Sequence, residues 1–174
     1  QIRHFRGTYL QDFIVDPDFP LVWRLQREIA GSGPLGDLAS HVIDLAHFLV
    51  GGIAEVVGME KTFIKERPVP SSMTGLSATS TGSAMEKVTV EDASNFLFQF
   101  DNGALGSLEA SRMCPGHKND LTFEINGSEG SVCFGLERMN ELRFFSRSDA
   151  SHAQGFRTIQ VTEPEHAYLE AWWP

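Results

Sequence analysis

The chain has 174 residues, of which 41% are hydrophobic and 21% are charged, and 23 acidic residues against 14 lysines and arginines give a net charge of −9. This length and composition are typical of one globular domain and exclude a chain too polar to fold. The negative net charge, with basic residues scattered along the sequence, argues against nucleic acid and anionic membrane as partners.

Cysteine usage and the chain ends bear on location and completeness. Cys114 and Cys133 belong to no CxxC pair or other zinc-ligand spacing, which predicts packed thiols. No segment resembles a signal peptide and no apolar run approaches the roughly 20 residues of a membrane span, so we expect a cytoplasmic protein. The chain begins at Gln1 rather than at methionine and ends in two adjacent tryptophans. We therefore expect residues 1–174 to be one domain of a longer protein, with the terminal aromatics packing against a missing part.

The first elements in chain order are a strand and two helices. Residues 2–13 are rich in aromatic and β-branched residues, which predicts a long strand. Pro17 and Pro20 end this strand, and residues 22–30 then predict a short helix. The pattern over residues 34–50 predicts a second helix, because a proline lies in its first turn and glycines follow its end.

Alternating runs beyond this helix predict strands joined by tight turns. A strand over residues 54–66 is followed by a loop, rich in Ser, Thr, Gly and Pro, that reaches about residue 90 and has too little apolar content for a core. The dipeptide Asn102-Gly103 between two alternating runs is a strong hairpin signal. The remaining predicted strands are residues 94–100, 104–111, 120–126, 130–136, 141–147 and 156–161. This layout predicts an α+β fold, with helices packed on one face of a large, open, mostly antiparallel sheet.

The second predicted helix has a polar face of unusual composition. At about 100° per residue, Asp37, His41 and Asp44 fall within an arc of about 60°, and Ser40 and His47 widen it to about 120°. A solvated helix face normally carries Lys, Glu, Arg and Gln, whereas this face has none of them and uses poorer helix formers. The polar face therefore either lines a cleft or simply faces solvent, and its composition favours the cleft.

Two kinds of chemistry suit these side chains. A histidine titrates near pH 6.5 and can exchange a proton at neutral pH, while a carboxylate one turn away can orient the ring or stabilise its charge. His41 and Asp37 are thus candidate catalytic residues. Asp and His also bind divalent ions. One helix can present two ligands, at positions i and i+4, but a metal site needs a third and a fourth, and no other His or Cys motif supplies them. We predict no metal ligands.

Weaker candidates surround this helix in the sequence. Trp23 and Arg24 could pair a hydrophobic wall with a forked donor, or could be a packed aromatic and a surface cation. Gln11 lies at the end of the first strand. No GxGxxG turn follows a strand and opens a helix anywhere in the chain, so we expect no cofactor-binding residues in this segment.

Residues 23–51 resemble a segment of the C-terminal domain of the glucose-fructose oxidoreductase and inositol dehydrogenase family (Gfo/Idh/MocA). The similarity lies in a glycine-containing turn, then D-x-x-x-H-x-x-D on a helix, then a closing glycine. Residues 123–134, FEINGSEGSVCF, resemble the hairpin of that family. The order of strand, helices and sheet is similar over nearly the whole chain.

The resemblance implies half of an enzyme. It implies a dihydrodipicolinate-reductase-like C-terminal fold and an N-terminal Rossmann domain, outside this chain, that binds NAD or NADP. It assigns Asp37 and His41 to the catalytic positions, and Asp44 matches a recurrent helix position whose role it leaves open. We count Asp44, together with Gln11, Trp23 and Arg24, among the candidate substrate contacts. Two departures stand out. The family's lysine lies in the absent domain, and Ser32-Gly33-Pro34 replaces a run of glycines.

The leading hypothesis is therefore the substrate domain of an NAD(P)-dependent oxidoreductase that acts on a hydroxyl of a sugar or polyol. The alternatives are a non-catalytic small-molecule binding or subunit-interaction module, and a metal-dependent hydrolase or isomerase. We also expect a homo-oligomer formed through the sheet face, because strands such as residues 95–100 and 121–125 carry more large apolar residues than one covered face would bury.

Overall fold

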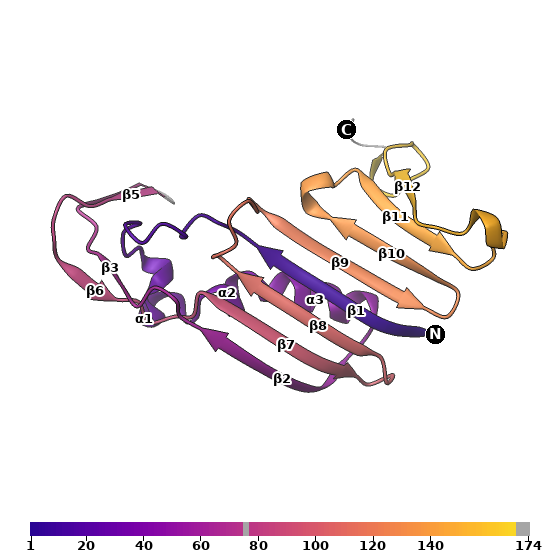
Figure 1. Ribbon diagram of the computed structural model, residues 1–174, viewed down its shortest axis with the longest axis horizontal. Helices are drawn as coiled ribbons and strands as arrows, with labels where there is room; N and C mark the ends of the chain where they lie inside the picture. Colours follow the sequence, from indigo (N-terminus) through magenta and orange to yellow (C-terminus); the bar gives the residue numbers. More distant parts are fainter. Residues whose placement is uncertain (75–76, 170–174) are drawn as a thin grey trace.

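The computed structural model describes residues 1–74 and 77–169, and the terminal tryptophans lie outside the described residues. An eight-stranded sheet in the order β12-β11-β10-β9-β1-β8-β7-β2 dominates the structure (Figure 1). Its strands are β1 Ile2–Leu10, β2 Ile53–Lys61, β7 Ala93–Phe100, β8 Leu105–Ser111, β9 Asp120–Gly127, β10 Gly130–Gly135, β11 Glu141–Ser146 and β12 Arg157–Gln160. Every neighbouring pair is antiparallel except β1 and β8, which confirms the predicted α+β fold.

The first strand lies near the middle of the sheet, between β8 and β9. It ends at Leu10 rather than at residue 13, because the next residues form a turn in which Val15 N donates to Asp12 O at 3.2 Å. Phe5, Gly7 and Tyr9 alternate onto the buried face. A Cβ added at Gly7 would lie well under 3.0 Å from Val42 Cγ1, so the absence of a side chain lets the covering helix pack closely on β1.

The predicted helix over residues 34–50 is broken into α2 (Pro34–Asp37) and α3 (Ala39–Leu49) at Leu38. The backbone at Leu38 stays near helical angles, but His41 N donates to Leu38 O at 3.2 Å, a three-residue bond in place of the four-residue one. The predicted helix over residues 22–30 is also divided. It forms a 3₁₀ turn, η1 (Trp23–Leu25), and the short helix α1 (Arg27–Ala30), because Gln26 between them is extended.

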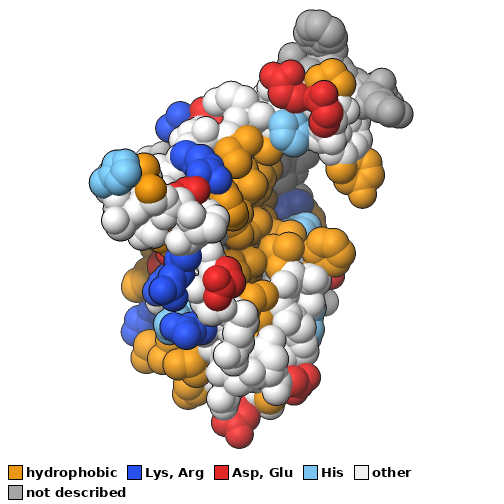
Figure 2. All heavy atoms as spheres, turned by 90° about the vertical axis from the view of Figure 1, so that its right-hand side faces the viewer, with side chains coloured by type: hydrophobic (Ala, Val, Ile, Leu, Met, Phe, Trp, Pro, Cys, Tyr) orange, Lys and Arg blue, Asp and Glu red, His pale blue; other side chains and the backbone are white. Residues whose placement is uncertain are grey.

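The main core lies between α3 and one face of the sheet. Val42 and Ala46 of α3 are fully buried, and they face the rings of Phe5, Phe98 and Phe100. The centroids of Phe98 and Phe100 are 5.2 Å apart at an edge-to-face angle of 72°, a favourable aromatic geometry. On the face seen from the right-hand side of Figure 1, hydrophobic side chains gather along the middle, and most of the visible lysine and arginine side chains lie to one side of them (Figure 2).

Residues 62–90 form an arm that extends beyond the sheet, at the left of Figure 1. The predicted loop contains two short antiparallel strand pairs, β3 (Glu66–Pro68) with β6 (Met85–Lys87) and β4 (Ser72–Thr74) with β5 (Ser77–Thr79). The prediction that this segment contributes no core was wrong. Val88 and Val90 are buried in a second cluster with Leu25 and other residues of the segment after β1.

The turn signals were the most reliable of the local predictions. Asn102-Gly103 forms the β7–β8 turn, with Gly103 at φ +83°, where a residue without Cβ is favoured. The expected β9–β10 hairpin also forms, and the two last predicted strands form β11 and β12, which pair with each other. Short 3₁₀ turns, η2 (Leu136–Arg138) and η3 (Ser151–Ala153), lie in the connections around β11. Within residues 1–74 and 77–169, no helix has the length and apolar character needed to cross a membrane.

Candidate active site

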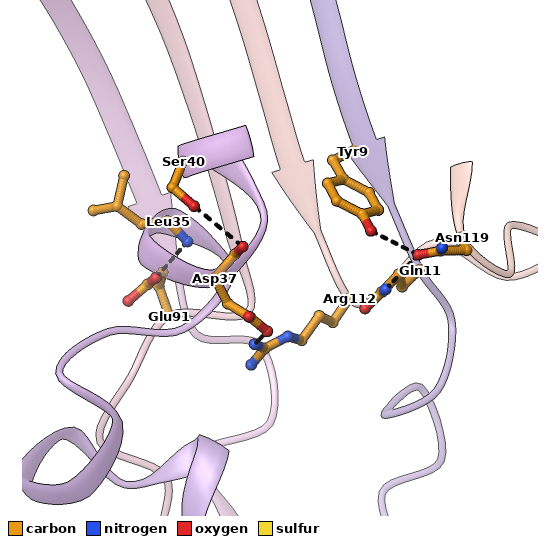
Figure 3. Close-up of polar contacts among 8 residues, drawn as sticks. All are labelled: Tyr9, Gln11, Leu35, Asp37, Ser40, Glu91, Arg112 and Asn119. Carbon is orange, nitrogen blue, oxygen red and sulfur yellow. Dashed lines mark hydrogen bonds and ion pairs between the residues drawn. The ribbon is translucent and has the colours of Figure 1, made fainter. Parts of the chain in front are cut away.

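Polar side chains converge where β1 and β8 end, β9 begins and α2 meets α3 (Figure 3). The site is built from one end of the sheet rather than from a closed cavity. The large hollows among the described residues lie elsewhere, on the sheet face that the helices leave uncovered. The candidate site therefore opens directly to solvent in this chain.

Asp37, the last residue of α2, forms an ion pair with Arg112, which directly follows β8. Arg112 Nη2 donates to Asp37 Oδ2. The arginine side chain is 1% exposed and the aspartate side chain 48% exposed. Burial lowers the pKa of Arg112, whereas the charge of Asp37 and its hydrogen bond oppose that shift. One end of this pair is thus fixed in the protein interior and the other is presented to solvent.

His41 lies in the first turn of α3, over the end of β1. Its ring centroid is 5.9 Å from that of Tyr9, with the rings inclined at 61°. Ser40 Oγ donates to Asp37 O at 3.3 Å, which satisfies the carbonyl that the break at Leu38 leaves unpaired within the helix. Asp37 and His41, the predicted catalytic residues, therefore lie in adjoining turns at the same end of the sheet.

A second polar group lies at the ends of β1 and β9. Asn119 Oδ1 accepts hydrogen bonds from Tyr9 Oη at 2.7 Å and from Gln11 Nε2 at 3.0 Å. Burial raises the pKa of Tyr9, so its hydroxyl stays protonated and remains a donor at neutral pH. Gln11 was predicted at this site, whereas Asn119 was not. Through these hydrogen bonds, the Asn119 side chain links β1, which carries Tyr9, to the loop before β9.

The loop before β9 is held by charged contacts. Lys118 Nζ donates to Asp12 Oδ2 at 2.6 Å. The backbone nitrogens of Lys118 and Asn119 donate to Glu137 Oε1 at 2.9 and 2.8 Å. The hydrogen bond from Lys118 lowers the pKa of Asp12, and the two backbone donors lower that of Glu137. These bonds fix the position of Asn119 at the rim of the site.

The start of α2 is held by Glu91, a buried residue that precedes β7. Leu35 N donates to Glu91 Oε1 at 2.9 Å, which satisfies one of the free donors at the beginning of a helix. Gly33 passes directly against this residue. A Cβ at that position would lie well under 3.0 Å from Glu91 O. The Ser32-Gly33-Pro34 segment therefore sets how closely α2 approaches β7, and with it the position of Asp37.

The other predicted substrate contacts lie around the site without bonding to its central residues. Trp23 is 38% exposed, and the guanidinium of Arg24 stacks 4.3 Å from its ring centroid. Burial is the largest cause of the lowered pKa of Arg112, and the charge of Arg24 lowers this pKa further, so the two cations repel each other. Asp44 is exposed on α3, one turn beyond His41. Among the residues that the structure describes, no group of three or more His, Cys, Asp or Glu side chains is placed to hold a metal ion.

Sequence reasoning missed Arg112, Asn119 and Glu91. Arg112 directly follows β8, as Gln11 directly follows β1, and this shared position was a signal that could have found it. Asn119 and Glu91 gave no such signal, because both lie in polar segments far from the helix in the sequence.

A mostly antiparallel open sheet, covered on one face by helices that carry an Asp and a His at the junction of α2 and α3, defines the class of this α+β domain. A model of the GFO/IDH/MocA C-terminal domain matches residues 1–133, and the chain belongs to this family.

Similar proteins include a levoglucosan dehydrogenase from Pseudarthrobacter phenanthrenivorans, 47% identical over 100% of this chain and 45% of that protein. A crystal structure of an oxidoreductase domain protein from Kribbella flavida is 50% identical, with a TM-score of 0.90, over 99% of this chain and 44% of that chain. A levoglucosan dehydrogenase structure in complex with NADH and levoglucosan is 45% identical, with a TM-score of 0.89, over 100% and 43%. This chain spans less than half the length of these relatives.

Proposed function

We propose that the chain is the substrate domain of an NAD(P)-dependent dehydrogenase that acts on a secondary hydroxyl of a sugar or polyol. The observation that carries this proposal is the arrangement of Asp37 and His41 at an open end of the sheet, where buried Arg112 forms an ion pair with Asp37. The relatives that share the whole chain support it, since a levoglucosan dehydrogenase binds NADH and levoglucosan in one structure.

His41 is the residue that exchanges the hydroxyl proton in this proposal. Oxidising an alcohol requires loss of a proton from oxygen and of a hydride from carbon, and the nicotinamide handles only the hydride. An imidazole on a solvent-open face can take the proton and pass it to water. Asp37 in the adjoining turn orients the ring or stabilises its charge, and the edge-on contact with the Tyr9 ring helps to hold the imidazole in place.

A polar rim suits a ligand with several hydroxyl groups. Gln11 and Asn119 present amide groups at the end of β1, and Asp44 and Arg24 present charged groups on the helix side. Trp23 adds an aromatic surface. Sugars are bound by such combinations because amides and carboxylates bond the hydroxyls while a ring face covers the C–H surface. We assign these residues to substrate recognition.

The nicotinamide cofactor would be held by another part of the complete protein. The described residues contain no parallel strand, glycine-rich turn and helix of the kind that binds a pyrophosphate, since the only parallel pair, β1 and β8, is joined through α3 and several antiparallel strands. The chain's own residues therefore fit the substrate side of the reaction, and the proposal requires a nucleotide-binding domain outside them.

The test is the activity of the complete reading frame. The purified protein is mixed with NAD or NADP and with anhydrosugars, hexoses, ketoses and inositols in turn, and absorbance of the reduced nicotinamide is followed. We expect turnover with at least one member of this panel and loss of turnover on His41→Ala. Turnover that is unchanged by this substitution would contradict the proposal. Activation by added zinc or manganese without nicotinamide would instead favour a metal-dependent hydrolase or isomerase.

A second proposal concerns the uncovered face of the sheet, which we assign to self-association. Val57, Met59, Leu97 and Leu105 are more than half exposed on neighbouring strands of this face. The face also carries both charge signs, with Arg6 paired to Glu124 at 3.2 Å across β1 and β9. A patch with both signs and an apolar centre is complementary to a second copy of itself related by a two-fold axis.

A further inference from the structure

Arg112 is a buried cation with few partners. Its side chain is 1% exposed, and among the described residues its Nε and Nη1 atoms form no hydrogen bond. Its recorded side-chain contacts are the Asp37 carboxylate and the ring of Phe13, whose centroid lies 5.7 Å from the guanidinium carbon. A guanidinium carries five donors, so one bonded nitrogen leaves most of its capacity unused.

Stability alone does not explain such a residue. Removing a guanidinium from water is costly, and one ion pair to a half-exposed carboxylate recovers little of that cost. Arg67, the other fully buried arginine of the described chain, shows the contrast. Its guanidinium donates to the carbonyl oxygens of Ile14, Asp16 and Phe19 and so ties the arm to the segment after β1. Arg112 makes no comparable set of structural bonds.

The surroundings of Arg112 fix it in place. Its backbone nitrogen donates to Asp92 O at 3.1 Å. Asp92 Oδ2 in turn accepts from the backbone nitrogens of Phe63 and Ile64, at 2.7 and 3.1 Å. The neighbouring Glu91 holds the start of α2 through Leu35 N. Both members of the Arg112 and Asp37 pair are thus anchored to one dipeptide, Glu91-Asp92, at the start of β7.

We propose that Arg112 is a positioning residue, which holds the Asp37 carboxylate through Oδ2 so that Oδ1 stays free to act on His41 or on a substrate hydroxyl. No residue of the described chain bonds Asp37 Oδ1, and that side chain is 48% exposed. The inference deepens the proposed function and rests on it, because it assigns a task to the carboxylate only if His41 exchanges the proton.

The test uses Arg112→Met and Arg112→Lys in the complete enzyme, with kcat, KM and the pH–rate profile measured for each. Methionine fills similar space without charge, and lysine retains the charge without the planar fork. We expect Arg112→Met to lower kcat on the order of 10- to 100-fold with little change in the KM for the nicotinamide, since a displaced carboxylate misaligns the reacting groups. The acid limb of the profile should move to higher pH, and lysine should restore part of both effects.

Arg27→Met is the matched control, because Arg27 is an exposed arginine whose ion pair to Glu91 is long, at 3.9 Å. It should leave the pH–rate profile unchanged. His41→Ala separates the two proposals. If His41→Ala abolishes turnover while both Arg112 variants keep the wild-type kcat and profile, the positioning role is overturned and the proposed function stands. If Arg112→Met does not fold, Arg112→Gln replaces it as the neutral variant, and a wild-type kcat and profile for Arg112→Gln overturns the role equally.

Discussion

Gly33→Ala should weaken the fold and the site together. The new Cβ would lie well under 3.0 Å from Glu91 O and 3.1 Å from Glu91 Oε1. An ordinary carbon–oxygen contact is about 3.3 Å or longer, so α2 or the Glu91 backbone must move by roughly 1 Å. The backbone carbonyl cannot rotate away as a flexible side chain would. The movement would also strain the bond from Leu35 N that begins α2.

The magnitude follows from two opposed effects. Alanine restricts the unfolded chain and on that account stabilises by about 0.4–1 kcal/mol, whereas overpacking a filled site costs about 1–3 kcal/mol. The net expectation is a loss of about 1–2 kcal/mol in the free energy of unfolding. Because α2 carries Asp37, turnover of the complete enzyme should fall as well.

The assay is urea unfolding of the two glycine variants beside the unchanged protein. Gly155→Ala is the control, since a Cβ there meets nothing within 4 Å and the residue lies outside the sheet. It should change stability by no more than about 0.5 kcal/mol. Equal midpoints for Gly33→Ala and Gly155→Ala would refute the reasoning that the Glu91 contact sets the position of α2.

Three further predictions concern other parts of the chain. Burial, and then the charge of Glu124, raise the pKa of the Cys133 thiol to about 11, so its alkylation by iodoacetamide should be slow at pH 8 and rise about tenfold per pH unit up to that value; rapid labelling at pH 8 of a variant lacking Cys114 would contradict this. Val57→Glu should shift the chain toward monomer in sedimentation at tens of micromolar, whereas Val56→Glu, equally exposed on the opposite face of β2, should not; equal effects would argue against an interface on the uncovered face. The isolated chain should not bind NAD or NADP in calorimetry, and micromolar affinity would show that it carries its own nucleotide site.

The sequence predicted the fold class because its local signals agree with the final structure. Phe96, Phe98 and Phe100 recur at every second residue, and the runs 94–100 and 104–111 flank Asn102-Gly103, so pattern and turn chemistry indicate the same hairpin. The arm was missed for the opposite reason. Val88 and Val90 are isolated apolar residues in a polar segment, and their burial depends on Leu25 and its neighbours, which are distant in the sequence.

Half of the site was visible from the sequence and half was not. Asp37 and His41 share one helical segment, so spacing alone brings them together. The break at Leu38 was not visible, because no Gly or Pro marks it in the sequence. In the structure His41 N bonds Leu38 O, and Ser40 Oγ bonds Asp37 O. Arg112 and Asn119 come from other strand ends, and only the register of β1 with β8 and β9 places them at the site.

The measurement that tests the account most directly is kcat of His41→Ala in the complete enzyme, beside His47→Ala. Both histidines are exposed on α3, but His47 lies in its last turn, away from Asp37. A positioned acid/base group contributes about 10²- to 10⁴-fold in rate, so His41→Ala should lower kcat by at least about 10²-fold with cofactor Kd and Tm nearly unchanged. His47→Ala should retain near-normal turnover. Near-normal turnover of His41→Ala would mean that the polar face of α3 is only a solvated surface.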